Sequence, residues 1–190
     1  MNGFDRLNWI EIDAFGPTLE ESLVLEAACV VTDADLNVLG IWNTVYGHPD
    51  EELARVETFA TSDYEGVFNE SRANWAGERH LLRDNGEQMI KLMEQHGSLG
   101  APLAAWDTPP MIGYIFHHFD ELKYGIAGGW PSIQLKDTFA WLESFGFATP
   151  QAPSDSERIG NSAAGNALLN IDTARMLREY FENGPRKVGN

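Results

Sequence analysis

Apolar segments in the first third of the chain are separated by short polar interruptions. Three segments rich in Val, Ile, Leu and Trp are predicted to form strands, and they cover residues 8–13, 23–31 and 36–45. Gly16-Pro17 breaks the chain after the first segment, and the polar residues 32–35 are typical of a turn between the second and the third. The pattern therefore predicts a three-stranded antiparallel meander.

The rest of the chain alternates helical periodicity with short apolar runs. Short strands are predicted at residues 102–106 and 133–135. Helices are expected from near Asn85 to His96 and over three later segments, 109–122, 138–145 and 162–183. The polar stretch 47–77 gives a weak signal, with a short helix over 48–56 and a loop or helix start over 69–74.

This order of elements predicts an α/β fold. Strands that first form a meander and then alternate with helices are typical of a mixed sheet, here of about five strands, with helices packed on both faces. No glycine- or serine-rich linker divides the chain, so a single domain is expected over residues 1–190.

Charge restricts the partners that the chain is expected to bind. Acidic residues outnumber basic ones by 29 to 13, which gives a net charge of −16 and makes long nucleic acid an unfavourable partner unless metal ions or a local basic patch reverse the sign. The alternative is that the acids only solubilise the surface. No apolar run approaches the roughly 18 residues of a membrane span, and the amino terminus lacks a secretory pattern, so a cytoplasmic protein is expected.

Several segments resemble one enzyme family. Residues 9–16, WIEIDAFG, are followed by LEESLVLEAACVVTDADLNVLG, and together they resemble the opening of the oligoribonuclease branch of the DEDD 3′–5′ exonucleases. Three later segments resemble further motifs of that family in the same order: PLAAW at 102–106, KDTF at 136–139 and GNALLNI at 165–171. The resemblance implies a ribonuclease H-like fold.

The resemblance also implies a chemistry, which is phosphodiester hydrolysis with two Mg²⁺ or Mn²⁺ ions held by four carboxylates and with a histidine as the base. Glu11 and Asp13 lie two residues apart on a strand, so both side chains point to one face and can share a metal ion. We expect these two to be catalytic metal ligands, although the family's Asp and Glu are exchanged here.

The other motif positions hold residues that cannot perform those roles. Met111 stands at the second-motif Asp, Gly165 at the base and Asn170 at the last ligand. Asp107 is a candidate third catalytic carboxylate, although helix capping is the favoured role for it. Asp172 lies roughly 200° around the helix from Asn170 and is no substitute. We rate the five histidines as poor candidates for the base.

Three functional hypotheses follow. The favoured one is a catalytically impaired pseudo-exonuclease that binds a nucleotide, a short oligonucleotide or a protein partner, with no metal cofactor required. The first alternative is a divergent active exonuclease that uses Glu11, Asp13 and Asp107 with one metal ion, or completes its site as a homodimer. The second alternative is an acidic interaction protein that binds a basic protein or imitates nucleic acid.

Overall fold

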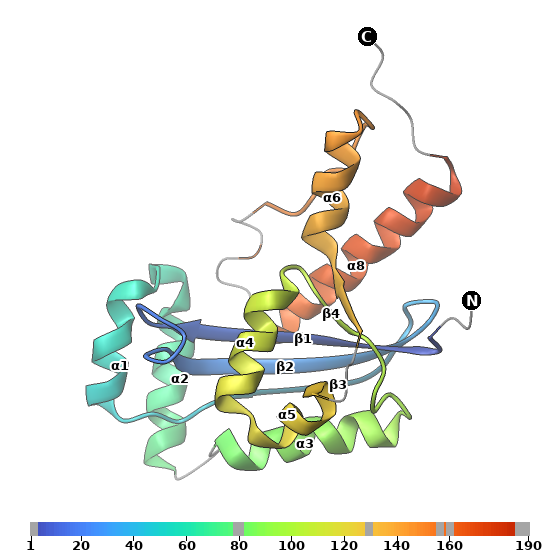
Figure 1. Ribbon diagram of the computed structural model, residues 1–190. Helices are drawn as coiled ribbons and strands as arrows, with labels where there is room; N and C mark the ends of the chain where they lie inside the picture. Colours follow the sequence, from blue (N-terminus) through green and yellow to red (C-terminus); the bar gives the residue numbers. More distant parts are fainter. Residues whose placement is uncertain (1–3, 78–81, 128–130, 155–157, 159–161, 185–190) are drawn as a thin grey trace.

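A five-stranded mixed sheet forms the centre of the fold in the computed structural model, which describes residues 4–77, 82–127, 131–154, 158 and 162–184 (Figure 1). The strand order is β3-β2-β1-β4-β5. The long strands β1 (Arg6–Phe15), β2 (Leu23–Asp33) and β3 (Val38–Val45) form an antiparallel meander. The short strands β4 (Leu103–Ala105) and β5 (Ser132–Gln134) add to β1 in parallel. The predicted α/β class and mixed sheet are confirmed.

Helices cover both faces of the sheet. On one face, α3 (Leu82–Gln95), α4 (Thr108–His118) and α5 (Asp120–Ala127) enclose a core that includes Ile10 and Ile12. On the other face, α6 (Leu135–Ser144) and α8 (Ala163–Glu182) pack over Trp9 and Val30. This arrangement explains why β2 is apolar at almost every position, because both of its faces are buried.

A third group of elements closes one end of the long strands. Helix α1 (Asp50–Val56) leads through the short turns η1 (Glu57–Phe59) and η2 (Ser62–Tyr64) into α2 (Glu65–Ala76). Leu53, Val56 and Phe68 pack there against Leu25 of β2. In Figure 1 this group lies at the far left, away from α6 and α8.

Several boundaries differ from the sequence prediction, and four of the differences have a clear origin or effect. Helix α2 is longer than the weak signal over 69–74 indicated, because it buries only Phe68 and Ser71 and so carries little periodicity. Helix α3 begins three residues before Asn85. The helix predicted to reach residue 122 ends at His118, because Phe119 leaves the helical conformation at φ −124° and ψ 81° before α5 starts. Leu135 begins α6 instead of ending β5.

None of the helices in the described part of the chain is both long and apolar enough to cross a membrane.

Candidate functional site: carboxylates beneath helix α8

The predicted pair Glu11 and Asp13 lies on the face of β1 that α8 covers. Alternation along the strand places both residues on the side of Trp9, while Ile10 and Ile12 point into the core under α3 and α4. The pairing with β2 shifts by one residue directly after Asp13, which indicates a β-bulge. Bulges bend a strand locally and are common next to active sites, so this one ends the regular ladder at the carboxylates.

A third carboxylate joins the pair, and the sequence analysis did not identify it. Glu26 of β2 is the cross-strand partner of Asp13, and only 2% of its surface is exposed. The backbone N–H of Ala163, at the amino end of α8, donates a hydrogen bond to it. Burial raises the pKa of Glu26, and this bond opposes the rise. The sequence contained one indication of this residue, because Glu26 is the single charged residue in the apolar run LVLEAACVV.

Glu11 is held by a chain of polar contacts that runs through α8. Nδ2 of Asn170 donates a hydrogen bond to Oε1 of Glu11, and the backbone N–H of Trp106 donates to the same carboxylate. Nη1 of Arg158 donates to Oδ1 of Asn170 over 2.8 Å, and its guanidinium lies 4.2 Å from the Trp106 ring centroid. Burial raises the pKa of Glu11 to about 7, although the Arg158 charge and both bonds act in the opposite direction.

Asp13 has a less favourable environment. Burial, followed by repulsion from Glu26 and Glu11, raises its pKa to about 8. Its Oδ2 atom is buried and has no hydrogen-bond partner among the described residues. Glu11 and Asp13 therefore hold protons to higher pH than free carboxyl groups do.

Asp107, the other predicted catalytic residue, lies beside this cluster but is engaged elsewhere. It stands one residue after Trp106, and its Oδ2 lies 3.1 Å from Nζ of Lys136. Asp107 occupies the N-cap position of α4, as the capping interpretation predicted, but its side chain makes no capping hydrogen bond. Its carboxylate thus pairs with a lysine and makes no capping bond, while its catalytic role stays a prediction.

Met111 and Gly165, which stand where the family has a metal ligand and a base, lie away from the carboxylates or have no side chain, and Asp172 does not replace them. Met111 packs against the core on the opposite face of the sheet. Gly165 lies in the first turn of α8, where its N–H donates to Oγ of Ser162 over 3.1 Å. Asp172 is exposed and pairs with Arg175.

The described histidines are engaged at other places. Nε2 of His48 lies 2.7 Å from the carbonyl oxygen of Val24, and the ring of His118 lies beside Ser22 and packs edge-on against His117. His96 is at the end of α3, and His80 falls outside the described residues.

The arrangement does not fit a two-metal centre. Such a centre requires four converging carboxylates, whereas Asn170 directs an N–H at Glu11 and Met111 faces the other core. Within the described ranges, no three His, Cys, Asp or Glu side chains are placed so that they alone hold a metal ion.

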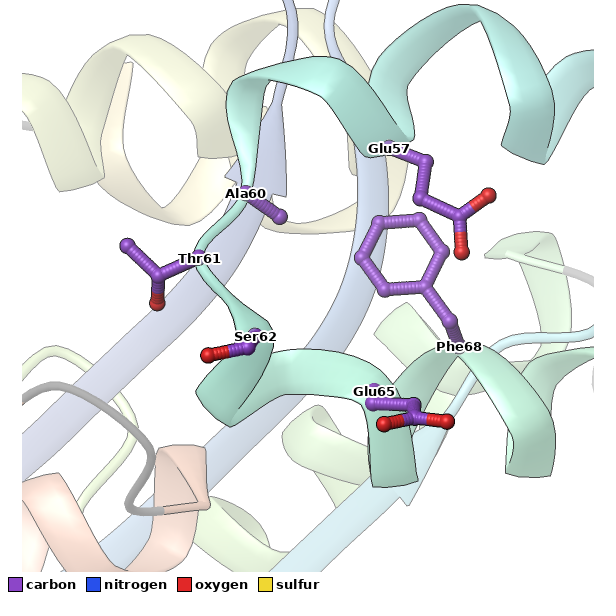
Figure 2. A pocket seen from close by; sticks show the side chains of 6 residues that line it. All are labelled: Glu57, Ala60, Thr61, Ser62, Glu65 and Phe68. Carbon is purple, nitrogen blue, oxygen red and sulfur yellow. The ribbon is translucent and has the colours of Figure 1, made fainter.

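A separate hollow lies between η1 and α2. It has a volume of about 230 Å³, and Figure 2 shows the Glu57 carboxylate beside the Phe68 ring, with Thr61 and Ser62 on the opposite side. Two of its lining residues are acidic, Glu57 and Glu65, and Glu57 also pairs with Arg72. An acidic lining disfavours phosphate groups, so this hollow is a poor site for a nucleotide.

Comparison with known proteins identifies relatives over part of the chain. No protein-family model matches it. The oligoribonuclease of Corynebacterium efficiens is 37% identical over 95 residues, which cover 48% of this chain and 41% of that protein. The oligoribonuclease of Rhodococcus jostii is 28% identical over 123 residues, which cover 62% of this chain and 60% of that protein. The chain thus matches less than two thirds of the length of these relatives.

Solved structures show the same fold at low sequence identity. Escherichia coli exonuclease I in complex with a dT13 oligonucleotide superposes with a TM-score of 0.61 and 12% identity, over 95% of this chain and 42% of that one. The exonuclease I of Methylocaldum szegediense gives a TM-score of 0.57 and 16% identity, over 92% and 40%. Other structures of the E. coli enzyme with single-stranded DNA are a zinc-bound and a metal-free form.

Proposed function

We propose that this chain, an oligoribonuclease-like relative within the DEDD 3′–5′ exonuclease superfamily, is a pseudo-exonuclease that binds a nucleotide or the end of a short oligonucleotide without hydrolysing it. The hydrogen bond from Asn170 to Glu11 carries this proposal. It places a neutral amide, itself bonded to Arg158, against the carboxylate that the family resemblance assigns to metal binding.

Loss of hydrolysis follows from the chemistry of these groups. An amide N–H that donates to a carboxylate oxygen competes with a metal ion for the same lone pair. The positive charge of Arg158 also acts on Glu11, so a metal ion that approached Glu11 would be repelled by this arginine. Gly165, which has no side chain, stands where the family places its base, and removal of such a group alone lowers rates by several orders of magnitude.

Retained binding is supported by a small basic surface at the end of β4. The Trp106 ring lies under the Arg158 guanidinium, and the carbonyl oxygen of Trp106 accepts the backbone N–H of Lys136 over 3.1 Å. A partly exposed aromatic ring beside a guanidinium suits a stacked base and its phosphate, and the ammonium of Lys136, which pairs with Asp107, is a second cation at this end of the strand. In this proposal, Arg158 and Lys136 provide the local positive charge that a protein with a net charge of −16 needs in order to bind an anion.

Hydrolysis and binding are tested separately. End-labelled short RNA and DNA are incubated with Mg²⁺ or Mn²⁺, and we expect the wild type to release no more product than Asp13→Ala, with Asp172→Ala as a matched exposed-acid control. Fluorescence anisotropy is expected to show binding of the same oligonucleotides. Lys136→Met should weaken that binding about 3–10-fold, whereas Lys91→Met on α3 should not.

The divergent active exonuclease remains a second candidate, because three carboxylates do gather on one face. Wild-type hydrolysis that Asp13→Ala abolishes and Asp172→Ala preserves would establish this candidate and overturn the pseudo-exonuclease. Absence of measurable binding to any short oligonucleotide would overturn the binding half of the proposal.

A further inference from the structure

Three aromatic rings gather at the carboxyl end of α6, the helix that rises away from the sheet in Figure 1. Trp141 is 51% exposed and Phe145 is 58% exposed. The Trp141 ring centroid lies 5.0 Å from that of Phe145 and 6.4 Å from that of Phe147, and the rings of Trp141 and Phe147 are stacked. We name these three residues the aromatic surface. Contiguous exposed apolar side chains of this size commonly mark a binding site.

The backbone at the end of α6 fixes the aromatic surface in place. Gly146 has a φ of 70°, and its N–H donates to the carbonyl oxygen of Glu143 over 3.0 Å. The N–H of Phe147 donates to the carbonyl oxygen of Leu142 over 2.8 Å, so the chain turns back on the helix. This turn holds Phe147 against Trp141. A surface that is already ordered loses little conformational entropy when a partner binds.

A hollow follows the aromatic surface along the chain. It has a volume of about 490 Å³ and lies between residues 148–150 and the carboxyl end of α8. The side chains of Ala148, Pro150 and Tyr180 give it apolar walls, and Asn183 provides a polar group. A hollow of this size and lining accommodates an apolar side chain of a partner.

Unpaired acidic side chains lie beside both features. Asp137 precedes Trp141 by four residues on α6, and Glu179 precedes Asn183 by four residues on α8, so each acid shares a side of its helix with one feature. Neither acid belongs to an ion pair within the described ranges. The cations of the two helices are already paired: Lys136 with Asp107, Arg175 with Asp172 and Arg178 with Asp35.

We propose that the aromatic surface and the hollow together bind a basic, proline-containing polypeptide segment of another protein. An arginine or lysine of that segment lies over the Trp141 ring as a cation–π pair, near the Asp137 carboxylate. A proline or leucine side chain enters the hollow, as extended proline-rich segments do in aromatic-lined grooves. The net charge of −16 favours the approach of such a segment. The inference does not rest on the proposed function, whose anion lies at Trp106.

A fluorescein-labelled peptide of repeated Arg-Pro-Leu units tests the aromatic contribution on the full chain. Fluorescence anisotropy is expected to show binding to the wild type. Phe145→Ser, at a position outside the core, should weaken binding about 5–30-fold. Trp141→Ala should have an effect of the same order and provides a second, independent variant. Trp75→Ser is the matched control, because Trp75 of α2 is 49% exposed and should not affect the affinity.

The same peptide tests the charge contribution. Glu179→Gln should weaken binding about 2–5-fold at low salt and less at high salt, because salt screens exposed charges. Glu94→Gln, at an exposed acid of α3, changes the net charge equally and should leave the affinity unchanged. A peptide of repeated Glu-Pro-Leu units should not bind. The effect of Phe145→Ser should persist at high salt, since it comes from an apolar contact.

Several outcomes would overturn this inference. They are absence of binding to the Arg-Pro-Leu peptide, equal binding of the Glu-Pro-Leu peptide, and equal weakening by the control variants. Sedimentation velocity tests for a second copy as the occupant: a dimer that Phe145→Ser dissociates would assign the surface to self-association. Replacement of Arg186 and Lys187 by glutamine tests the chain's own end, and a rise of about tenfold in peptide affinity would assign the surface to it.

Oligonucleotide binding separates this inference from the proposed function. Phe145→Ser should bind short oligonucleotides as the wild type does, whereas Lys136→Met should bind the Arg-Pro-Leu peptide no less tightly than the wild type. Loss of both ligands in Phe145→Ser would show that one surface serves both, and it would overturn the separate peptide site.

Discussion

The Glu11 carboxyl group accepts hydrogen bonds from Asn170 and from the backbone of Trp106, yet its pKa lies at about 7. The effect of burial on the pKa is larger than the opposing effects of the hydrogen-bond donors and of the Arg158 charge, so ionisation of Glu11 lowers the stability of the folded state. Single residues at this site thus affect stability through their charge state as well as through packing.

Stability is expected to depend on pH in an unusual direction. The pKa of Glu11 rises on folding from 4.5 to about 7, so between these values the folded state binds more protons than the unfolded state. The free energy of unfolding should therefore fall as pH rises from 4.5 to 7, and Asp13 extends the fall to about 8. In EDTA, Glu11→Gln should be more stable than the wild type by about 1–3 kcal/mol at pH 8 and by little at pH 4.5.

Urea denaturation at several pH values measures this difference. Glu143→Gln, a change at an exposed acid of α6, is the control and should follow the wild type at every pH. A wild type that gains stability steadily from pH 4.5 to 8 would contradict the assignment of buried, protonated carboxyl groups.

Arg158 is expected to stabilise the fold through Asn170. Arg158→Met keeps much of the side-chain volume but removes the bond to Asn170 and the charge that acts on Glu11. We expect a loss of about 1–3 kcal/mol at pH 8, measured by urea denaturation, and a smaller loss at pH 4.5. An equal loss at both pH values would indicate a packing role against Trp106 instead.

Among the helices, α8 contributes most to the site, because it supplies the N–H of Ala163 to Glu26 and the amide of Asn170 to Glu11. Its amino end is fixed by Oγ of Ser162, which accepts the N–H of Gly165. The position of this cap sets how the helix lies on Glu26.

Ser162→Ala should therefore destabilise the protein by about 0.5–2 kcal/mol, as expected for loss of an N-cap. Ser162→Asp should retain most of the stability, since a carboxylate also caps and interacts favourably with the helix dipole. Chemical denaturation of the two variants provides the comparison. An equal loss of stability in the two variants would show that stability depends on the local backbone geometry and not on the capping oxygen.

The elements also show what the sequence allowed to be predicted. Periodicity located the long strands and α8, because their buried positions repeat regularly. It missed the extent of α2, whose buried side is limited to Phe68 and Ser71. Glu26 was missed for a different reason, since its place opposite Asp13 depends on the register between two strands, which one strand's sequence does not contain.

For the molecule as a whole, net charge governs what can approach the site. The net charge of −16 disfavours the approach of a phosphate backbone, so the proposed binding depends on the few cations beside Trp106, Lys136 and Arg158. We expect affinity to fall, or to stay level, as an oligonucleotide is lengthened beyond the few nucleotides that this surface contacts. Anisotropy with a length series at two salt concentrations measures this. Affinity that increases with length and decreases steeply with salt would contradict it.

The bond between Arg158 and Asn170 also bears on how this chain can change over evolutionary time. Replacement of Asn170 by aspartate, which the family pattern favours, would place the new carboxylate 2.8 Å from a guanidinium, if the geometry is kept. The new acid would then form an ion pair with Arg158, which would compete with a metal ion for the carboxylate. If the chain lacks hydrolysis, as proposed, the carboxylate introduced at position 170 would be free to meet a metal ion only when Arg158 is replaced as well.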